Sequence, residues 1–516
     1  MWFELEAAVK RAADAKIRNF DRYRKRIYDE NVRRARRSSG APPGLIAREP
    51  ELWALEKGLD PFHVRKRAKS IAHAITGSLQ AGIYAPLPPG GFSRRKSNGG
   101  MRTISTFALA DEVVSNRLYR NLLKKNRPRL SARSYAYRDD ANAYDAIAHM
   151  QSEWREDHRV FIAEYDFNEF FESISHDHIW NTIEALGLTM TALERSLVSA
   201  FLVAPRPFTN AAEKAAGGEP RMRGVPLRTA ISLLMANIAE SPLDRALERL
   251  GVGFVRYADD TVIWSRDYSA ICRAVDELHD ASAQMGCPVN QVKSEGVRLL
   301  VSRETEKAEM RWTREVTYLS HNVGLRSTRM KPSVEEEIKR RVSVLLYDNL
   351  IREPSRGTQA LSRVGLNDRD YVVYIWQLRR YLYGPLAETA VRRMGRGPVP
   401  RVPLRGVIAR YPLVNDDDRL ADLDRWVATQ TWLALRKRAR LLAPHVSASI
   451  TPPSPWGLSR EDLINATSVS QRTGAPLDLR LPSALRMAVV VREAVRTHGV
   501  DVVGSGLGLY GRRGID

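Results

Sequence analysis

The chain has 516 residues, which is long enough for two or more domains with a sizeable core. Its 81 Lys and Arg residues exceed its 60 Asp and Glu residues, and the formal net charge of +21 favours polyanionic partners. Two cysteines, Cys272 and Cys287, exclude a four-cysteine zinc centre and provide no disulfide framework. No apolar run of about 18 residues could span a bilayer and no signal pattern is present, so we expect a cytoplasmic protein without a membrane partner.

The first predicted element is a basic helical segment over residues 1–37. Its cationic clusters, Arg24 to Arg26 and Arg33 to Arg37, fit either a structured RNA partner or a solvated helix face. We assign residues 1–91 to a basic N-terminal helical extension. A loop over residues 85–98, rich in Pro, Gly and Arg, leads into the next region.

A short apolar stretch over residues 159–165 predicts a strand, and Asp166 stands at its end. A carboxylate at the end of a strand can hold a divalent cation on a rigid element. An isolated acid at this position would also serve as a helix cap. Asp259 follows 93 residues later, which leaves room for a helical crossover and a further strand.

Residues 254–264 read Phe-Val-Arg-Tyr-Ala-Asp-Asp-Thr-Val-Ile-Trp and predict a hairpin that turns at Asp259 and Asp260. Neighbouring carboxylates repel one another unless cations neutralise them, and the apolar flanks favour a buried hairpin over a solvated one. Mg²⁺ usually takes one or two carboxylates, with waters and phosphates completing its shell. Together with Asp166, the acidic pair predicts a nucleotidyl-transfer site with two Mg²⁺ ions, or Mn²⁺ as an alternative.

Seven segments between about residues 92 and 325 stand in the order that is typical of bacterial reverse transcriptases. They are residues 103–119, residues 134–146, the Asp166 segment, Gly224-Val225-Pro226, the Asp259 hairpin, residues 286–293 and residues 316–324. The stretch resembles the fingers and palm of group II intron, retron and phage-defence enzymes. This resemblance implies an α+β right-hand polymerase fold over residues 92–330. It also implies RNA-directed DNA polymerase activity with an RNA template, dNTPs and a DNA product.

The resemblance assigns metal and sugar-binding roles at matching positions. Asp166, Asp259 and Asp260 are the catalytic metal ligands, and the backbone carbonyl of Phe167 is a further ligand. Phe171 stands where related enzymes place the side chain that crowds the 2′ position of the sugar, which predicts deoxynucleotide use. The alternative for Phe171 is a helix residue that only packs in the core.

Basic residues take substrate roles in the same comparison. Lys96 and Arg102 lie in a Gly-containing hairpin that clamps the triphosphate in related enzymes, although a solvated turn could have this composition. Lys293 matches the general acid toward the leaving pyrophosphate, with a solvated lysine as the alternative. Leu227 and Arg228 depart from the family, which commonly has Gln-Gly there. We expect Arg228 to lie beside the incoming base or template, where it alters base selection or closes the template path.

These departures narrow the subgroup. The missing Gln and the absence of a Cys₄ appendage disfavour an intron maturase, and Val316-Thr317-Tyr318 lacks the Val-Thr-Gly of retrons. The chain is most similar to abortive-infection and other defence-associated reverse transcriptases, which implies antiphage defence with a dedicated noncoding RNA. Untemplated or protein-primed DNA synthesis, a group II intron-like enzyme and a non-catalytic RNA-binding scaffold remain open, as does homo-oligomerisation.

Beyond residue 331 the strand signals fade and apolar residues recur at helical spacing. We predict a helical thumb-like region over residues 331–445 and a C-terminal extension over residues 446–516. The predicted helices cover residues 334–350, 368–383, 418–442 and 482–498. The Gly-rich end lacks the strand and helix that flank a phosphate-binding loop, so we predict a tail or an interaction element there.

Overall fold

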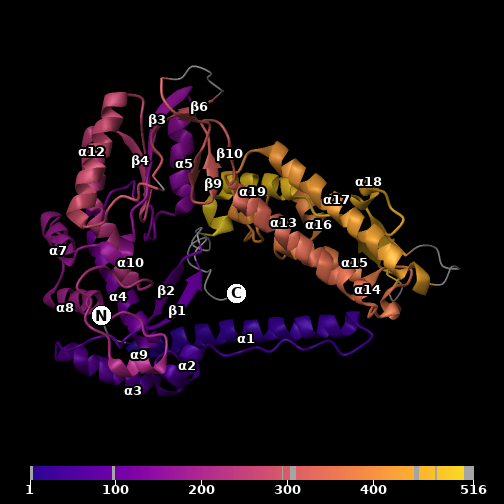
Figure 1. Cartoon of the computed structure of the whole chain (residues 1–516), viewed down its shortest axis with the longest axis horizontal. Helices are drawn as coiled ribbons and strands as arrows, with labels where there is room; N and C mark the ends of the chain where they lie inside the picture. Colours follow the sequence, from indigo (N-terminus) through magenta and orange to yellow (C-terminus); the bar gives the residue numbers. More distant parts are fainter. Residues whose placement is uncertain are drawn as a thin grey trace.

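The chain combines helices and small sheets in the mixed α+β class that the sequence predicts (Figure 1). The computed structural model describes residues 4–95, 99–292, 294–302, 309–446, 453–470 and 473–504. A helical N-terminal part, a five-stranded sheet with its covering helices, and a helical arm follow one another along the chain. None of the helices in these ranges is both long and apolar enough to cross a membrane.

The N-terminal part is held together by small apolar side chains. Its elements are α1 (Leu5–Arg37), α2 (Glu51–Leu55), α3 (Pro61–Gln80), β1 (Gly90–Arg95), β2 (Met101–Thr106) and α4 (Leu109–Asn126). Val9 and Ala13 of α1 pack against Val64 and Ala68 of α3, and all four are buried. β1 and β2 form an antiparallel hairpin. The helix predicted over residues 1–37 is therefore confirmed as α1.

The central sheet has the strand order β4-β5-β3-β6-β7. Its strands are β3 (Arg159–Tyr165), β4 (Gly253–Tyr257), β5 (Asp260–Ser265), β6 (Gly296–Val301) and β7 (Trp312–Thr313). Neighbouring strands are antiparallel, except for the parallel pair β6 and β7. Successive strand residues point to opposite faces, so Ala163 and Ile263 pack into one core while Ile162 and Val262 pack into another. Both faces of the sheet are therefore covered, which explains its nearly continuous apolar strands.

Helices cover the two faces of this sheet. The helices of this region are α5 (Ala143–Trp154), α6 (Phe170–Ser173), α7 (His176–Ala185), α8 (Ala192–Leu202), α9 (Ala211–Ala216), α10 (Ala230–Ala239), α11 (Ser241–Leu250) and α12 (Tyr268–Met285), with the short η1 (Arg127–Arg129) after α4. Of these, α9 has no buried residue and lies beside the N-terminal helices rather than on the sheet (Figure 1). Ile271 and Leu278 of α12 belong to the core with Ala163, whereas Ile147 and Met150 of α5 belong to the opposite core. The ends of β3 and of the β4–β5 hairpin are thus fixed from both sides.

A small antiparallel sheet, β8 (Val316–Tyr318), β9 (His321–Val323) and β10 (Thr328–Met330), leads into the helical arm. The arm contains α13 (Pro332–Leu346), the π-helical turn η2 (Tyr347–Ile351), α14 (Arg352–Arg356), η3 (Leu361–Arg363), α15 (Arg369–Tyr383), α16 (Glu388–Met394), η4 (Ile408–Arg410), α17 (Asp417–Leu442), η5 (Ala443–His445), α18 (Arg460–Leu463), β11 (Thr467–Val469), β12 (Pro476–Asp478), α19 (Ala484–His498) and η6 (Val500–Val503). The four helices predicted beyond residue 331 are confirmed as α13 with η2, α15, α17 and α19. The β11–β12 hairpin was not predicted, because three-residue strands give no periodic signal.

A buried arginine ties the arm together. Arg438 of α17 has no exposed side-chain surface and donates to Asp368 (Nε–Oδ2, 2.6 Å) and to Asp370 (Nη2–Oδ2, 3.0 Å) at the start of α15. It also donates to the backbone carbonyl of Leu350 in η2 (3.0 Å). One guanidinium of α17 thus satisfies acceptors from two other elements, α15 and η2, as a buried charge requires.

The long helix α1 connects the N-terminal part to the far end of the arm (Figure 1). Its 33 residues span about 50 Å at 1.5 Å per residue. The last residue, Arg37, is buried and donates to Asn349 of η2 (2.6 Å), while the amide of Ala360 donates to the Arg37 carbonyl (2.8 Å). The amide of Ser39 donates to the Thr358 carbonyl (2.7 Å). The N-terminal part, the central sheet and the arm therefore form a closed ring, in which α1 links the N-terminal part to the far end of the arm.

Candidate active site

The strands β4 and β5 form the hairpin that the sequence predicts around the acidic pair. Tyr257 pairs with Asp260, so Ala258 and Asp259 are the two turn residues. Ala258 is buried and has φ +59°, the left-handed conformation that two-residue hairpins use at their first turn position. Asp259 is half-buried and Asp260 is exposed. The turn therefore lies one residue earlier than the predicted turn at Asp259 and Asp260. Asp259 is in the turn and Asp260 begins β5, so both residues lie at the same end of the sheet.

Asp166 directly follows β3, the strand that lies beside β5. Tyr165 pairs with Thr261, and the same register continued by one residue sets Asp166 opposite Asp260. Opposed residues of antiparallel strands have Cα atoms about 4.5–5.5 Å apart. The amide of Asp166 donates to the hydroxyl of Ser294 (3.2 Å). The predicted carboxylates from the two distant segments are thus brought to the same end of the sheet.

The segment predicted downstream of the hairpin runs beside the residues that follow β3. The amide of Asn168 donates to the carbonyl of Pro288 (2.8 Å), and the amide of Asn290 donates to the carbonyl of Asp166 (2.7 Å). These bonds occupy the backbone groups on either side of Phe167. Because alternate carbonyls of an extended chain point to opposite sides, the Phe167 carbonyl points toward β5. That direction agrees with its predicted role as a metal ligand.

The oxygen donors at this end of the sheet fit Mg²⁺. In the described ranges, no three or more His, Cys, Asp and Glu side chains gather into a group that could hold a metal ion. Mg²⁺ needs no such group, because it usually takes one or two carboxylates and fills its octahedral shell with waters and substrate phosphates. Asp166, Asp259 and the Phe167 carbonyl are hard oxygen donors of this kind.

The turn at Gly224 packs directly against α6, which carries Phe171. The amide of Val225 donates to the Phe171 carbonyl (2.6 Å). Gly224 has φ +79°, and a Cβ there would lie 2.5 Å from the carbonyl oxygen of Glu172, so both its conformation and the close approach require glycine. The Phe171 side chain is 8% exposed and contacts the Phe170 ring edge-on at a centroid distance of 5.3 Å. The predicted sugar-selecting residue is therefore held in place by the Gly-Val-Pro turn.

Arg228 occupies a strained backbone position beside the β1–β2 hairpin. Its φ is +72°, in the left-handed region that costs a non-glycine residue about 1–2 kcal/mol. Its guanidinium carbon lies 5.9 Å from the centroid of the Phe92 ring in β1. Partial burial and the charge of Arg94 lower the pKa of Arg228, while Glu112 opposes this shift. The exposed Arg228 side chain therefore projects next to the predicted triphosphate clamp rather than into the core.

Three of the predicted basic residues lie wholly or partly outside the described part of the structure. Lys96 and Lys293 lie outside the described residues. Arg102 lies in β2, where its backbone pairs with Arg94 of β1, and its side chain is outside the described part of the structure. Their predicted roles thus remain predictions.

Arg256 is a residue of the site region that the sequence analysis did not single out. It lies in β4, three residues before Asp259, and its side chain is 1% exposed. It donates to Asp244 through Nε (2.7 Å) and Nη2 (2.5 Å), and to Glu240 through Nη1 (2.6 Å). Burial raises the pKa of Glu240 well above its usual range, and Arg256 opposes that shift. The signal in the sequence was a single arginine within an otherwise apolar strand.

The same residue also holds the predicted Ser-Tyr-x-Tyr-Arg segment through its backbone. The amide of Tyr135 donates to the Arg256 carbonyl (2.8 Å), and the Arg256 amide donates to the Arg133 carbonyl (3.0 Å). Within this segment, burial and then the charge of Asp259 raise the pKa of the Tyr137 hydroxyl. Tyr137 therefore stays neutral beside the acidic turn.

Residues 94–323 match the family described as reverse transcriptase (RNA-dependent DNA polymerase). The match contains the ends of β3 and the β4–β5 hairpin, with Asp166, Asp259 and Asp260. These residues form a reverse transcriptase domain, and the enzyme class of this domain is that of an RNA-directed DNA polymerase, a nucleotidyltransferase. The comparison with curated proteins gives no match.

Solved telomerase structures resemble the chain at low similarity. Telomerase from Candida tropicalis in complex with a TWJ fragment of telomeric RNA aligns with a TM-score of 0.37 and 11% identity, over 73% of this chain and 66% of that one. Apo telomerase from Candida tropicalis truncated from its C-terminal domain gives 0.37 and 12%, over 60% and 76%. Telomerase from Candida albicans with a TWJ fragment gives 0.36 and 10%, over 74% and 67%. The chain thus spans just under two thirds of the first of these telomerases.

The first prediction concerns Arg256. Replacing Arg256 by Met leaves Asp244 and Glu240 buried without their cation, so we expect the free energy of unfolding to fall by about 3–5 kcal/mol. Carboxyls whose folded-state pKa is raised stabilise the fold only while protonated, so the loss should be smaller at pH 5 than at pH 8. Urea unfolding at both pH values measures this. The control Arg249→Met, on the exposed face of α11, should change stability by less than about 0.5 kcal/mol.

The second prediction separates the charge of Arg228 from its backbone strain. Arg228→Gly and Arg228→Ala both remove the guanidinium, but only glycine adopts φ +72° without strain. We expect the Gly variant to be more stable than the Ala variant by about 1 kcal/mol in urea unfolding. If the cation contacts substrate or template, primer extension should fall in both variants, by roughly ten- to hundredfold. Equal stability of the two variants would show that the position is unstrained, and wild-type activity in both would remove Arg228 from the site.

Proposed function

We propose that the chain is an RNA-directed DNA polymerase that adds deoxynucleotides to a primer by two-metal catalysis. One observation carries the proposal: Asp166 stands at the end of β3, opposite the acidic turn of the β4–β5 hairpin, within the matched domain. Asp166, Asp259 and the Phe167 carbonyl would hold the ions, with Asp260 beside them. Bound Mg²⁺ would activate the primer 3′-hydroxyl and neutralise the charge of the triphosphate and pyrophosphate.

The remaining site residues position the substrate. Phe171, fixed by the Val225 hydrogen bond, would limit the space at the 2′ position of the sugar. Arg102 and Lys96 would clamp the triphosphate from the β1–β2 hairpin, and Lys293 would protonate the leaving pyrophosphate. Arg228, beside Phe92, would contact the triphosphate or the template from the palm side.

We place the polymerase among bacterial reverse transcriptases, nearest to the abortive-infection and defence-associated enzymes that act with a noncoding RNA. The departure at Leu227 and Arg228 and the net charge of +21 support this. The strained Arg228 also favours a second candidate, untemplated or protein-primed DNA synthesis by the same site. Arg228 has a left-handed backbone conformation that is unfavourable for a residue other than glycine. Proteins retain such strained conformations mainly at functional sites.

The third prediction tests the metal site. Asp259→Asn should reduce nucleotide incorporation by more than roughly 100-fold, since losing only a residue that orients a metal ligand already costs 10–100-fold. Folding should be unaffected, because Asp259 is half-buried at a turn. Primer extension in Mg²⁺ and thermal unfolding measure the two effects, and chelating the metal should abolish wild-type activity. The control Asp280→Asn, on the exposed side of α12, should keep full activity. Substantial polymerisation by Asp259→Asn would refute the assignment.

The fourth prediction tests sugar selection. Phe171→Val opens space at the 2′ position, so the ratio of kcat/KM for ribonucleotides to that for deoxynucleotides should rise by roughly tenfold or more. Phe170→Val is a matched control, because Phe170 is also buried and its replacement removes the same atoms from the same helix. The control should lose stability to a similar degree without a change in the ratio. If both variants shift the ratio equally, Phe171 is only a packing residue.

A further inference from the structure

The surface around the end of α16 is strongly basic. Residues 389–415 contain no acidic residue and six arginines, namely Arg392, Arg393, Arg396, Arg401, Arg405 and Arg410. This stretch runs from α16 through a Gly- and Pro-containing loop to η4 and beyond. It lies in the helical arm, away from β4 and β5 (Figure 1). Positive charge is thus concentrated in a part of the chain that carries none of the predicted catalytic residues.

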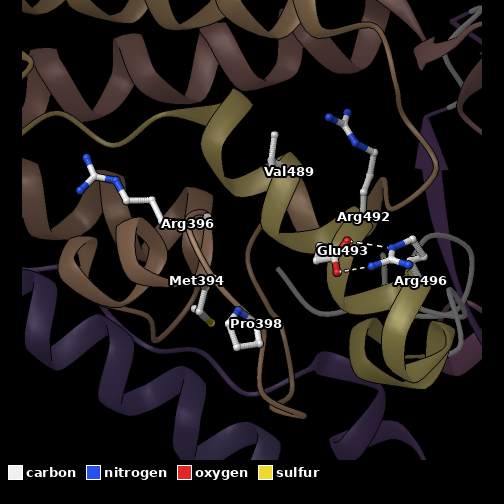
Figure 2. Close-up of a pocket in the computed structure, with 9 residues that line it drawn as sticks. Met394, Arg396, Pro398, Val489, Arg492, Glu493 and Arg496 are labelled. Atoms are coloured by element: carbon white, nitrogen blue, oxygen red, sulfur yellow. Dashed lines mark hydrogen bonds and ion pairs between the residues drawn. The ribbon is translucent and has the colours of Figure 1, made fainter.

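Two hollows meet on this surface at Arg396 and Gly397. One has a volume of about 500 Å³ and lies between the end of α16 and α19, and the other has a volume of about 580 Å³ and lies along α16 toward Arg480. Figure 2 shows Arg396 on one side of the first hollow, with Arg492 and Arg496 of α19 on the other. We call the two hollows together the arginine groove.

Most arginines of the groove are fixed by acidic partners. Arg492 is paired with Asp417 (2.8 Å), Arg496 with Glu493 (2.6 Å), Arg392 with Glu388 (2.7 Å) and Arg480 with Asp478 (2.6 Å). Arg393 and Arg396 differ from these four. Both are exposed, and within the described ranges neither side chain makes a hydrogen bond or an ion pair. The groove therefore presents two cations without counter-ions on a rim that the paired arginines hold in position.

The lining indicates the chemistry of a ligand. Guanidinium groups only donate hydrogen bonds, and their planar fork matches the oxygens of a phosphate. In the described part of the chain, no Phe, Tyr, Trp or His lines either hollow, so the groove offers no surface for stacking a base. Protein partners usually bind through buried aromatic or apolar anchors, whereas six arginines line the two hollows beside the apolar Met394, Pro398 and Val489. A sugar–phosphate backbone read without its bases fits best.

We propose that the arginine groove binds the phosphate backbone of a structured RNA outside the polymerase site, with Arg393 and Arg396 as the contacting cations. The choice of RNA over DNA rests on the proposed function, whereas the phosphate contact rests on the groove itself. Such a site would hold the RNA partner on the arm while its template segment is copied at the end of the sheet where Asp166 and Asp259 lie. It would contribute affinity and a strong dependence on salt, but no base specificity.

The test compares two double variants of the full chain. Arg393→Gln/Arg396→Gln removes the two cations without counter-ions, and Arg249→Gln/Arg273→Gln removes two exposed arginines of α11 and α12 as a matched control. Binding of an RNA stem-loop with a 3′-phosphate, which cannot prime, is measured by fluorescence anisotropy over a range of KCl concentrations. We expect the groove variant to bind roughly tenfold or more weakly. Its plot of log K against log[KCl] should be flatter by about 1–2. The control variant should retain the wild-type slope, and neither variant should lose thermal stability.

Each other outcome overturns the proposal. Wild-type affinity and slope in the groove variant would remove the groove as a phosphate site. Wild-type affinity for a DNA stem-loop of the same sequence that equals or exceeds the affinity for the RNA would refute the assignment to RNA. A loss confined to a polyglutamate peptide would indicate an acidic protein partner instead. Asp259→Asn should bind the RNA like wild type, whereas the groove variant should extend a short primed template like wild type. Failure of the polymerase proposal and failure of this one are therefore distinguishable.

Discussion

The geometry of the acidic turn depends on one cation buried beneath it. Arg256 satisfies two carboxylates from the α10–α11 region through its side chain and binds the segment of Arg133 and Tyr135 through its backbone. A buried ion pair of this kind gives little net stability relative to an apolar replacement, but removing one partner is costly. Its contribution is therefore to specify one arrangement, in which β4 cannot shift relative to α11 or to the Tyr135 segment. Ala258 and Asp259 lie only two and three residues after Arg256, so their positions are fixed as well.

The arm is restrained in a similar way at its far end. The chain joins it to the central sheet through the small sheet of β8, β9 and β10, and its other end is held by α1 through Arg37, Asn349 and backbone bonds to residues 358 and 360. An arm held only at one end could swing as a rigid body, whereas here any such motion must break these bonds or move α1 and the N-terminal helices with it. Arg438 prevents the alternative of bending within the arm, since it links α17 to η2 and α15. The distance between arm and hairpin is thus set by two buried arginines and one helix.

Local patterns in the sequence predicted the elements that local physics determines. Helical periodicity located α13, α15, α17 and α19, and an acidic pair between apolar runs located the β4–β5 turn. The features that were missed depend on contacts between distant residues. Arg37 meets Asn349 across 312 positions of the chain, and nothing near Arg37 distinguishes it from the exposed Arg36. The left-handed backbone of Arg228 was missed for a different reason. A glycine at this position would have indicated a left-handed backbone, whereas an arginine does not. The sequence placed Asp166 and Asp259 in the same site only through the order of the motifs, whereas the strand register places them there directly.

The distribution of paired and unpaired cations connects these observations. Among the described residues the four buried arginines, Arg37, Arg256, Arg379 and Arg438, all have acidic partners, as low-dielectric surroundings demand. Since the buried charged residues of the described ranges include more acids than arginines, the excess positive charge of the chain lies on the surface. There it is uneven, with residues 389–415 carrying six arginines and no acid. Exposed cations that served only solubility would gain nothing from this clustering, because like charges close together repel and destabilise the fold. A bound polyanion removes that repulsion, which gives the clustering a physical reason.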